Sequence, residues 1–255
     1  MNRIQELFHR KREDVLSIYF TAGFPQLQDT ASIITALTSS GADMIEIGIP
    51  FSDPLADGPI IQESSRVALK NGMSLSLLFE QLSTIRKDTQ VPLVLMGYLN
   101  PILQYGIARF CATAAACGID ALIIPDLPLS VFREEWAAIL TQHQLSIIFL
   151  ITPQTAMSRV LEIDALTDSF IYLVTDAATT GGRLEFNVQQ KAYLEQMKQA
   201  RLRNPLMAGF GVRSKEDISN LREYVQGVIV GSSFIRSLDQ ERLSESIAGF
   251  VQSLQ

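Results

Sequence analysis

The sequence predicts an α/β protein with the architecture of a (β/α)8 TIM barrel. Three observations support this prediction: short apolar runs recur along the whole chain, stretches with helical periodicity lie between them, and 255 residues is a typical length for such a barrel. The eight runs expected to form strands are Val15–Phe20, Met44–Ile47, Leu93–Met96, Ala121–Ile124, Ser146–Leu150, Phe170–Val174, Leu206–Ala208 and Gly227–Val230. The clearest helical stretches are Asp29–Ser39, Leu75–Lys87, Ile107–Ala116, Phe132–His143 and Lys215–Tyr224.

Two helices are followed by similar turn sequences, Ser-Gly41-Ala-Asp43 and Cys-Gly118-Ile-Asp120. Glycine suits the left-handed position that ends a helix. The echo indicates a βα unit of roughly 30 residues, and eight such units fill a barrel of about 250 residues. No linker divides the chain, so we expect a single domain over residues 1–255. A doubly wound open sheet is the alternative, although its common strand orders use five or six strands.

The composition excludes several classes of partner. Lysine and arginine number 21 against 27 acidic residues, a net charge of −6, and no basic run could follow a nucleic-acid backbone. Although 47% of the residues are hydrophobic, no stretch of about 18 apolar residues is present, so we expect no membrane span. The N-terminal segment is charged and lacks the apolar core of a signal peptide, which makes the cytoplasm the expected location.

Cysteines and histidines are few and dispersed. Cys111 and Cys117 lie too far apart for a CxxC motif, and we expect both to be reduced core thiols. His9 and His143 belong to no cluster with metal-ligand spacing, so we expect both at the surface and no metal site. Proton transfer in this chain therefore falls mainly to carboxylates.

Glu46 is the most informative residue. It lies in the apolar run Met44-Ile-Glu-Ile-Gly48, where side chains alternate between two faces. If the isoleucines face the helices, Glu46 points into the barrel near the carboxyl end of its strand, where barrel enzymes carry their chemistry. The structural alternative is a buried glutamate paired with a cation, but the adjoining loop Gly48–Ile61 supplies none. A carboxylate in an apolar site tends to have a raised pKa that suits proton transfer.

Three aspartates in loops allow two interpretations each. Asp53 and Asp57 follow the second predicted strand, and Asp126 follows the fourth in the segment Ile-Ile-Pro-Asp-Leu-Pro. Each could face a site at the carboxyl end of the barrel. Each could equally form a turn or a cap, because aspartate beside proline or glycine is common there.

The last loops carry a different pattern. Ala-Gly209-Phe-Gly211-Val follows the seventh predicted strand, and Val-Gly231-Ser-Ser follows the eighth. Glycines there let backbone N–H groups approach an anion, and many barrels bind phosphate at this position. The alternative is two tight turns. A small-residue loop over residues 175–182, after the sixth strand, is long enough to act as a lid.

These motifs resemble those of the α subunit of tryptophan synthase. The resemblance covers nearly the whole chain and rests on IEIGIPFSDPLADGPIIQ, the segment Tyr98-Leu-Asn-Pro, IIPDLP, a Tyr-Leu loop ending in Thr-Gly, GFGV and VGSS. It implies a lyase that cleaves indole-3-glycerol phosphate to indole and glyceraldehyde 3-phosphate. It also implies a β partner that carries pyridoxal phosphate, in an α2β2 complex, with no cofactor in this chain.

The resemblance assigns roles to individual residues. Glu46 and Asp57 match the catalytic carboxylates. The matching substrate-binding residues are Tyr19, Tyr98, Tyr172, Thr180, Gly181, Phe210, Gly211, Gly231 and Ser232. The loop Pro50–Pro54 and the surface near the third and fourth strands would face the β subunit.

One departure from the family pattern concerns the lid. The family commonly has Ser-Arg at the start of this loop, whereas this chain has Thr175-Asp176, which places an acid near an anionic substrate. Asp176 therefore raises a second hypothesis, a regulatory subunit that activates a β partner with little chemistry of its own. A third hypothesis is another phosphate-binding barrel, such as an isomerase of the same pathway, which would need a different acid–base arrangement.

Overall fold

The computed structural model describes residues 2–175, 186–209 and 211–255. Its strands form one parallel sheet in the order β5-β4-β3-β2-β1-β9-β8-β7-β6. The strands are β1 (Val15–Thr21), β2 (Met44–Gly48), β3 (Leu93–Met96), β4 (Ala121–Ile123), β5 (Ser146–Ile148), β6 (Leu150–Ile151), β7 (Ile171–Val174), β8 (Leu206–Gly209) and β9 (Gly227–Val230). The two ends of this order, β5 and β6, are separated only by Phe149, whose carbonyl accepts a hydrogen bond from the Tyr172 amide at 2.9 Å. The sheet therefore closes, and the predicted eight-stranded barrel is confirmed, with its fifth strand divided in two.

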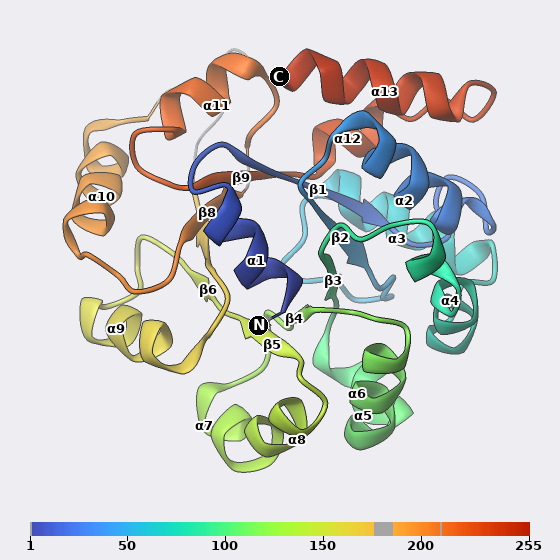
Figure 1. The fold of residues 1–255 in the computed structure, drawn as a ribbon, viewed down its shortest axis with the longest axis horizontal. Helices are drawn as coiled ribbons and strands as arrows, with labels where there is room; N and C mark the ends of the chain where they lie inside the picture. Colours follow the sequence, from blue (N-terminus) through green and yellow to red (C-terminus); the bar gives the residue numbers. More distant parts are fainter. Residues whose placement is uncertain (1, 176–185, 210) are drawn as a thin grey trace.

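Helices surround the barrel, as Figure 1 shows. They are α1 (Arg3–Arg10), α2 (Asp29–Ser40), α3 (Pro59–Lys70), α4 (Leu75–Leu82), α5 (Leu99–Tyr105), α6 (Ile107–Ala116), α7 (Leu129–Val131), α8 (Ala137–Gln142), α9 (Met157–Leu166), α10 (Val188–Gln199), α11 (Lys215–Leu221), α12 (Ser232–Ser237) and α13 (Leu243–Leu254), with a 3-10 turn, η1 (Ile85–Lys87), and a π-helical stretch, η2 (Phe132–Trp136). In the described part of the chain, none of these helices combines the length and apolar character that a bilayer crossing requires.

Several predicted helices differ in their bounds. The stretch predicted over Leu75–Lys87 divides into α4 and η1, because the Ser83 hydroxyl bonds the Glu80 carbonyl at 2.7 Å and so competes with the helical ladder. The stretch over Phe132–His143 begins as the π-helix η2, and the last predicted helix ends at Leu221 rather than Tyr224. The predicted helix-ending glycines are confirmed, since Gly41 and Gly118 have φ values of 92° and 75°.

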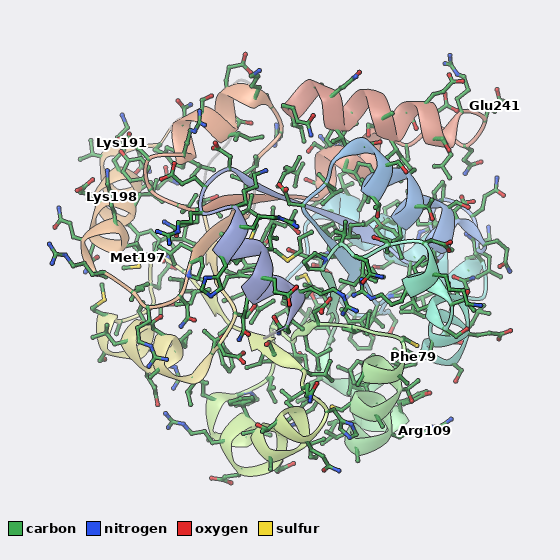
Figure 2. The ribbon with its side chains drawn as sticks, viewed as in Figure 1. Phe79, Arg109, Lys191, Met197, Lys198 and Glu241 are labelled. Atoms are coloured by element: carbon green, nitrogen blue, oxygen red, sulfur yellow. The ribbon has the colours of Figure 1, made fainter. Side chains whose placement is uncertain are left out.

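Two hydrophobic layers follow from the alternation of side chains along the strands. Ile45 and Ile47 belong to the outer layer between the sheet and the helices. Met44 of the same strand belongs to the inner layer that fills the barrel, together with Val94 and Met207. In the outer layer, Phe79 of α4, labelled in Figure 2, meets the rings of Tyr105 and Phe110 with centroids 5.5 Å apart in each case. The outer layer thus fixes the strands, and the inner layer determines what lies at their ends.

The helix α1 covers the amino end of the barrel. Ile4 and Leu7 on this helix are buried against the inner layer, and Figure 1 shows α1 lying across the ring of strands. The Asn2 side chain accepts hydrogen bonds from the backbone amides of Ile4 and Gln5 and so caps the helix, while its amide group donates to the Ser146 hydroxyl at 2.7 Å. The amino end is therefore closed.

Ion pairs and backbone contacts satisfy the carboxylates at this closed end. Asp120, which is 3% exposed, accepts hydrogen bonds from Arg3 at 3.0 Å, from Arg86 at 2.7 Å and from the Leu93 amide at 2.9 Å. Asp43 likewise accepts from the Leu16 amide at 2.9 Å and from a lysine. The two aspartates of the repeated Gly-x-Asp turns therefore each bind the first part of a neighbouring strand.

Candidate functional site

A cavity of about 90 Å³ lies at the carboxyl end of the barrel. Residues from β1, β7 and the segments that follow β2, β8 and β9 contribute to its wall. Its lining includes Tyr19, Asp57, Gly58, Ile61, Met96, Tyr172, Gly211, Val212, Ile229, Gly231 and Ser232. Most of the predicted site residues that the structure describes therefore lie around this one cavity.

Glu46 lies inside the barrel, as the alternation of β2 predicts. Its side chain is 0% exposed, and its Oε1 atom accepts a hydrogen bond from the Ser17 hydroxyl at 2.9 Å. The other oxygen, Oε2, has no hydrogen-bond partner among the described residues. No lysine or arginine in that part of the chain pairs with it, so the structural alternative of a buried ion pair is not found. Burial raises the pKa of Glu46 to about 8, with the Ser17 hydrogen bond acting in the opposite direction.

Asp57 lies in the loop after β2, within reach of Tyr98. The loop is fixed there because the backbone amide of Ala56 donates a hydrogen bond to the Tyr98 hydroxyl at 2.9 Å. Desolvation raises the pKa of Asp57 to about 6, while the hydrogen bond with Tyr98 lowers it. The two carboxyl groups therefore have different pKa values, as in enzymes that use one group as an acid and another as an anion.

Tyr19 and Tyr172 occupy equivalent positions in the wall. A Cβ atom at Gly48 would lie only 2.1 Å from the Tyr19 hydroxyl, and one at Gly209 would lie 2.0 Å from the Tyr172 hydroxyl. Each tyrosine therefore leans from its own strand over a glycine of the next strand. The sequence alone does not reveal this function for either glycine, because the relation depends on strand register. The pattern that could have identified it is an inward-facing tyrosine followed, two residues later, by the residue that pairs with a glycine on the next strand.

The four groups form one electrostatic cluster. Burial raises the pKa of Tyr19 and of Tyr172, and the charges of Glu46 and Asp57 raise both values further. Both hydroxyls therefore stay protonated at neutral pH and can donate hydrogen bonds.

Glycine turns border the cavity on its other side. Gly211 has a φ of 82°, a left-handed conformation that glycine adopts without strain. Gly231 precedes the first turn of α12, and Ser232 is the first residue of that helix. Thr180, Gly181 and Phe210, which the sequence also predicts as substrate-binding residues, lie outside the described residues, as does Asp176.

Two of the ambiguous aspartates have local partners. Asp53 is exposed and accepts a hydrogen bond from the neighbouring Ser52 hydroxyl at 2.5 Å. Asp126 is also exposed and accepts from the Leu99 amide at 2.9 Å, at the start of α5. Both contacts correspond to the turn or cap interpretation.

The remaining sequence predictions concern thiols, histidines and metals. Cys111 and Cys117 are free and buried, as predicted, and burial raises the pKa of both thiols. His9 is exposed and His143 is partly exposed at the end of α8, in agreement with the prediction that both lie at the surface. Among the described residues, no group of three histidine, cysteine or acidic side chains is placed to hold a metal ion.

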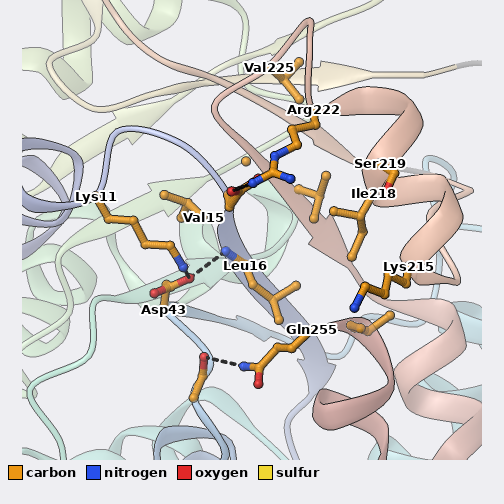
Figure 3. A pocket seen from close by; sticks show the side chains of 15 residues that line it. Lys11, Val15, Leu16, Asp43, Lys215, Ile218, Ser219, Arg222, Val225 and Gln255 are labelled. Atoms are coloured by element: carbon orange, nitrogen blue, oxygen red, sulfur yellow. Dashed lines mark hydrogen bonds and ion pairs between the residues drawn. The ribbon is translucent and has the colours of Figure 1, made fainter.

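A larger cavity, about 320 Å³, lies at the amino end between β1, α11 and α13 (Figure 3). Four of its charged groups form ion pairs: Lys11 pairs with Asp43 at 2.6 Å, and Arg222 pairs with Asp14. The Gln255 side chain donates to the Gly41 carbonyl at 3.4 Å. These contacts connect structural elements, and the end of a barrel at which they lie usually serves stability.

The fold and the site together define a class of protein, a TIM barrel with buried carboxyl and tyrosine groups beside glycine turns at the carboxyl ends of its strands. Comparisons with known proteins identify the family. The family model described as "Tryptophan synthase alpha chain" matches residues 5–253. A tryptophan synthase alpha chain from Phocaeicola vulgatus is 53% identical over 241 residues, which cover 94% of this chain and 93% of the relative.

Solved structures agree with the sequence comparison. The alpha subunit from Legionella pneumophila str. Paris has a TM-score of 0.88 and 34% identity, covering 100% of this chain and 97% of that chain. A tryptophan synthase from M. tuberculosis in an aminoacrylate-bound form has a TM-score of 0.86 and 28% identity, covering 100% and 98%. The chain belongs to the tryptophan synthase alpha chain family.

Proposed function

We propose that Glu46 and Asp57 are the catalytic groups of an indole-3-glycerol phosphate lyase. Membership of the family makes this chain the subunit that cleaves indole-3-glycerol phosphate to indole and glyceraldehyde 3-phosphate in tryptophan biosynthesis. The observation that carries the assignment of residues is a fully buried glutamate with one unpartnered oxygen among the described residues. Glu46 is not itself in the cavity lining, but its charge acts on Tyr19 and Tyr172, which line the cavity together with Asp57. Among the described residues, no cation neutralises it.

The different pKa values suggest different roles. With a pKa of about 8, Glu46 holds its proton at neutral pH, whereas Asp57, with a pKa of about 6, is mostly ionised. Glu46 is thus suited to begin the reaction as an acid. Asp57 is suited to stabilise a positive charge, because a fixed anion in a partly desolvated site acts strongly on charge that develops beside it.

The chemistry balances with a single carboxyl group. Glu46 donates its proton to C3 of the indole ring, and the positive charge that results on the ring nitrogen is stabilised by Asp57. The Glu46 carboxylate then takes the proton of the hydroxyl next to the breaking bond. As that hydroxyl becomes the aldehyde of glyceraldehyde 3-phosphate, the electrons of the carbon–carbon bond return to the ring. Indole leaves, and Glu46 has regained its proton.

The rest of the substrate would contact the walls of the cavity. We assign the indole ring to Tyr19, Tyr98 and Tyr172, whose buried rings suit an aromatic ligand. The phosphate would bind at the glycine turns. The residues assigned to it are Gly211, Gly231 and Ser232, with Thr180, Gly181 and Phe210 from the segments outside the described residues. Backbone N–H groups at such turns are suited to anions.

A complex with a β subunit completes the proposal. The solved relative from M. tuberculosis is described as tryptophan synthase, and we infer that this chain also joins a β subunit, in an α2β2 assembly, with pyridoxal phosphate held by the partner. The loop after β2 is a suitable contact, because Leu55 is 94% exposed beside the half-buried Phe51. The mass of the assembly measured by light scattering would test the stoichiometry.

The central test is indole release by Glu46→Gln and Asp57→Asn. We expect each variant to lose activity by roughly 10²- to 10⁴-fold, the usual value of general acid–base catalysis. Asp53→Asn, assayed like the other variants without a β subunit, is the matched control, because Asp53 lies in the same loop but its exposed carboxylate accepts its hydrogen bond from the neighbouring Ser52. Near-normal turnover in the Glu46 variant would refute the assignment.

The pH profile of the unaltered protein provides a second readout. The quantity kcat/KM reports the free protein, so it should rise as Asp57 ionises near pH 6 and fall as Glu46 loses its proton near pH 8. In the residual activity of Glu46→Gln, kcat/KM should no longer fall at alkaline pH. An alkaline limb that persists in that variant would mean that another group donates the proton.

A further inference from the structure

Ser17 is a polar residue in an apolar part of the barrel. It lies on β1, is 0% exposed, and is opposite Met44 on one neighbouring strand and Ile229 on the other. Both neighbours are buried in the inner hydrophobic layer. Burying a hydroxyl group there costs free energy unless it makes a hydrogen bond.

The hydrogen bond that compensates this cost is made to Glu46. The Ser17 hydroxyl donates to Oε1 at 2.9 Å, which leaves Oε2 as the oxygen without a partner among the described residues. In the strand register, Glu46 is opposite Tyr19 and Ser17 is opposite Met44, two residues nearer the amino end. The hydroxyl therefore meets the carboxyl group from the side away from the glycine turns.

This contact limits how the carboxyl group can rotate. The last torsion of a glutamate is broad, so an unheld carboxyl group samples many orientations. The bond to Ser17 holds one oxygen on the amino-end side, which directs the other away from it. It also favours the ionised form, because a donated hydrogen bond stabilises negative charge.

From this geometry we infer that Ser17 is a positioning residue, which holds the Glu46 carboxyl group in the orientation in which Oε2 meets the substrate. The inference rests on the proposed role of Glu46 and extends it to a residue that makes no contact with the reacting atoms. The other titratable groups near Glu46 are Tyr19 on β1, Tyr172 on β7 and Asp57 in the loop after β2. The Ser17 hydroxyl donates a hydrogen bond directly to Glu46, so its removal should alter the carboxyl group.

The test compares Ser17→Ala, Ser17→Thr and the control Ser146→Ala. Ser146 is also a buried strand serine, 3% exposed, and its hydroxyl accepts from Asn2 far from Glu46. For Ser17→Ala we expect kcat to fall about tenfold and the alkaline limb of kcat/KM to move up by roughly one pH unit, since a hydrogen bond to a charged group is worth about that much. Ser17→Thr keeps the hydroxyl, so kcat/KM should fall at the same alkaline pH as in the unaltered protein. Ser146→Ala should not change this pH either.

A second readout does not depend on activity. In protein labelled with ¹³C at the glutamate carboxyl carbon, the signal of Glu46 is the one that disappears in Glu46→Gln. Its titration midpoint should rise in Ser17→Ala and return in Ser17→Thr. This measurement remains valid if the alanine variant loses stability, provided that it is folded.

The possible outcomes separate the two proposals. An unchanged limb and an unchanged Glu46 titration in Ser17→Ala would overturn the inference, even if Glu46→Gln is inactive. Full activity in Glu46→Gln would overturn the proposed function instead. A fall in kcat with no change in either titration would mean that Ser17 serves only packing, which also overturns the inference.

Discussion

Buried carboxylates lie at both ends of this barrel, but they have different partners. Asp120 at the amino end is 3% exposed and accepts hydrogen bonds from two arginines and a backbone amide. Glu46, nearer the carboxyl end, is 0% exposed and has a single hydroxyl group as its partner. The two side chains are similarly buried and carry the same kind of group. Only the first is fully paired.

The difference shows how one protein can use the same functional group for two purposes. A carboxylate surrounded by cations and N–H groups is stable in its charged form and holds structural elements together. A carboxyl group in an apolar site with one weak donor exchanges its proton near neutral pH instead. The surroundings, rather than burial alone, thus distinguish the structural carboxylate from the one that we propose as catalytic.

The largest effect on stability is expected from Asp120→Ala. The substitution leaves Arg3 and Arg86 without their shared partner and removes the acceptor of the Leu93 amide. Because both arginines are partly exposed, we expect a loss of about 3 kcal/mol in the free energy of unfolding, at the lower end for a broken buried pair. Urea unfolding would measure it, with kcat of the folded fraction unchanged.

The control for this experiment is Glu63→Ala, which removes an exposed ion pair with Arg66. Its unfolding midpoint should hardly change, because solvent screens such pairs. A loss of stability in Glu63→Ala equal to that in Asp120→Ala would contradict the distinction between paired groups in the interior and at the surface.

A smaller effect of opposite sign is expected from Glu46→Gln. The pKa of Glu46 is raised by folding, so ionisation costs stability as the pH rises from about 4.5 to about 8, and the cost is complete above that range. Glutamine never ionises, although its buried amide group needs partners of its own. Ionisation of Glu46 should cost about 5 kcal/mol at pH 9, whereas the buried amide costs about 3 kcal/mol at either pH. We therefore expect the variant to be more stable than the unaltered protein by about 2 kcal/mol at pH 9 and less stable by about 3 kcal/mol at pH 4.5.

Urea unfolding at these two pH values would measure the change. Asp57 is present in both proteins, so its own titration cancels in the difference. An equal effect at both pH values would show that the substitution acts through packing and that Glu46 does not titrate as its surroundings indicate.

The smallest effect is expected from Asp126→Ala. This residue lies at the carboxyl end of the barrel, yet its carboxylate accepts a hydrogen bond from the Leu99 amide and is therefore paired, as Asp120 is. Loss of such a helix cap costs about 1 kcal/mol. Thermal unfolding should show that decrease while indole release stays within twofold of the unaltered protein. A large loss of activity at unchanged stability would mean that position along the barrel matters more than pairing.

Much of the fold could be predicted from the sequence because periodicity is a local signal. The eight apolar runs predicted the barrel, and the alternation of side chains along β2 predicted that Glu46 lies inside it. The break of the fifth strand at Phe149 and the π-helical start at Phe132 were not predicted. Neither leaves a periodic signal in the sequence, since a strand interrupted at one residue and a helix with one extra residue per turn change the pattern very little.

The candidate site was predicted in its residues but not in its contacts. Motifs indicated the carboxylates, the tyrosines and the glycine turns. The partner of Glu46 was missed, because Ser17 lies 29 residues earlier in an apolar run and becomes its neighbour only through the register of β1 and β2. Asp126 remained ambiguous for a similar reason, since its partner Leu99 belongs to another βα unit.

The pairing of each wall tyrosine with a glycine on the next strand constrains how this cavity can evolve or be redesigned. Tyr19 fills the volume above Gly48, and Tyr172 fills the volume above Gly209. Shortening either tyrosine enlarges the cavity in one step. A side chain at either glycine can be accommodated only afterwards, so mutational routes to a new ligand must change the aromatic member of each pair first.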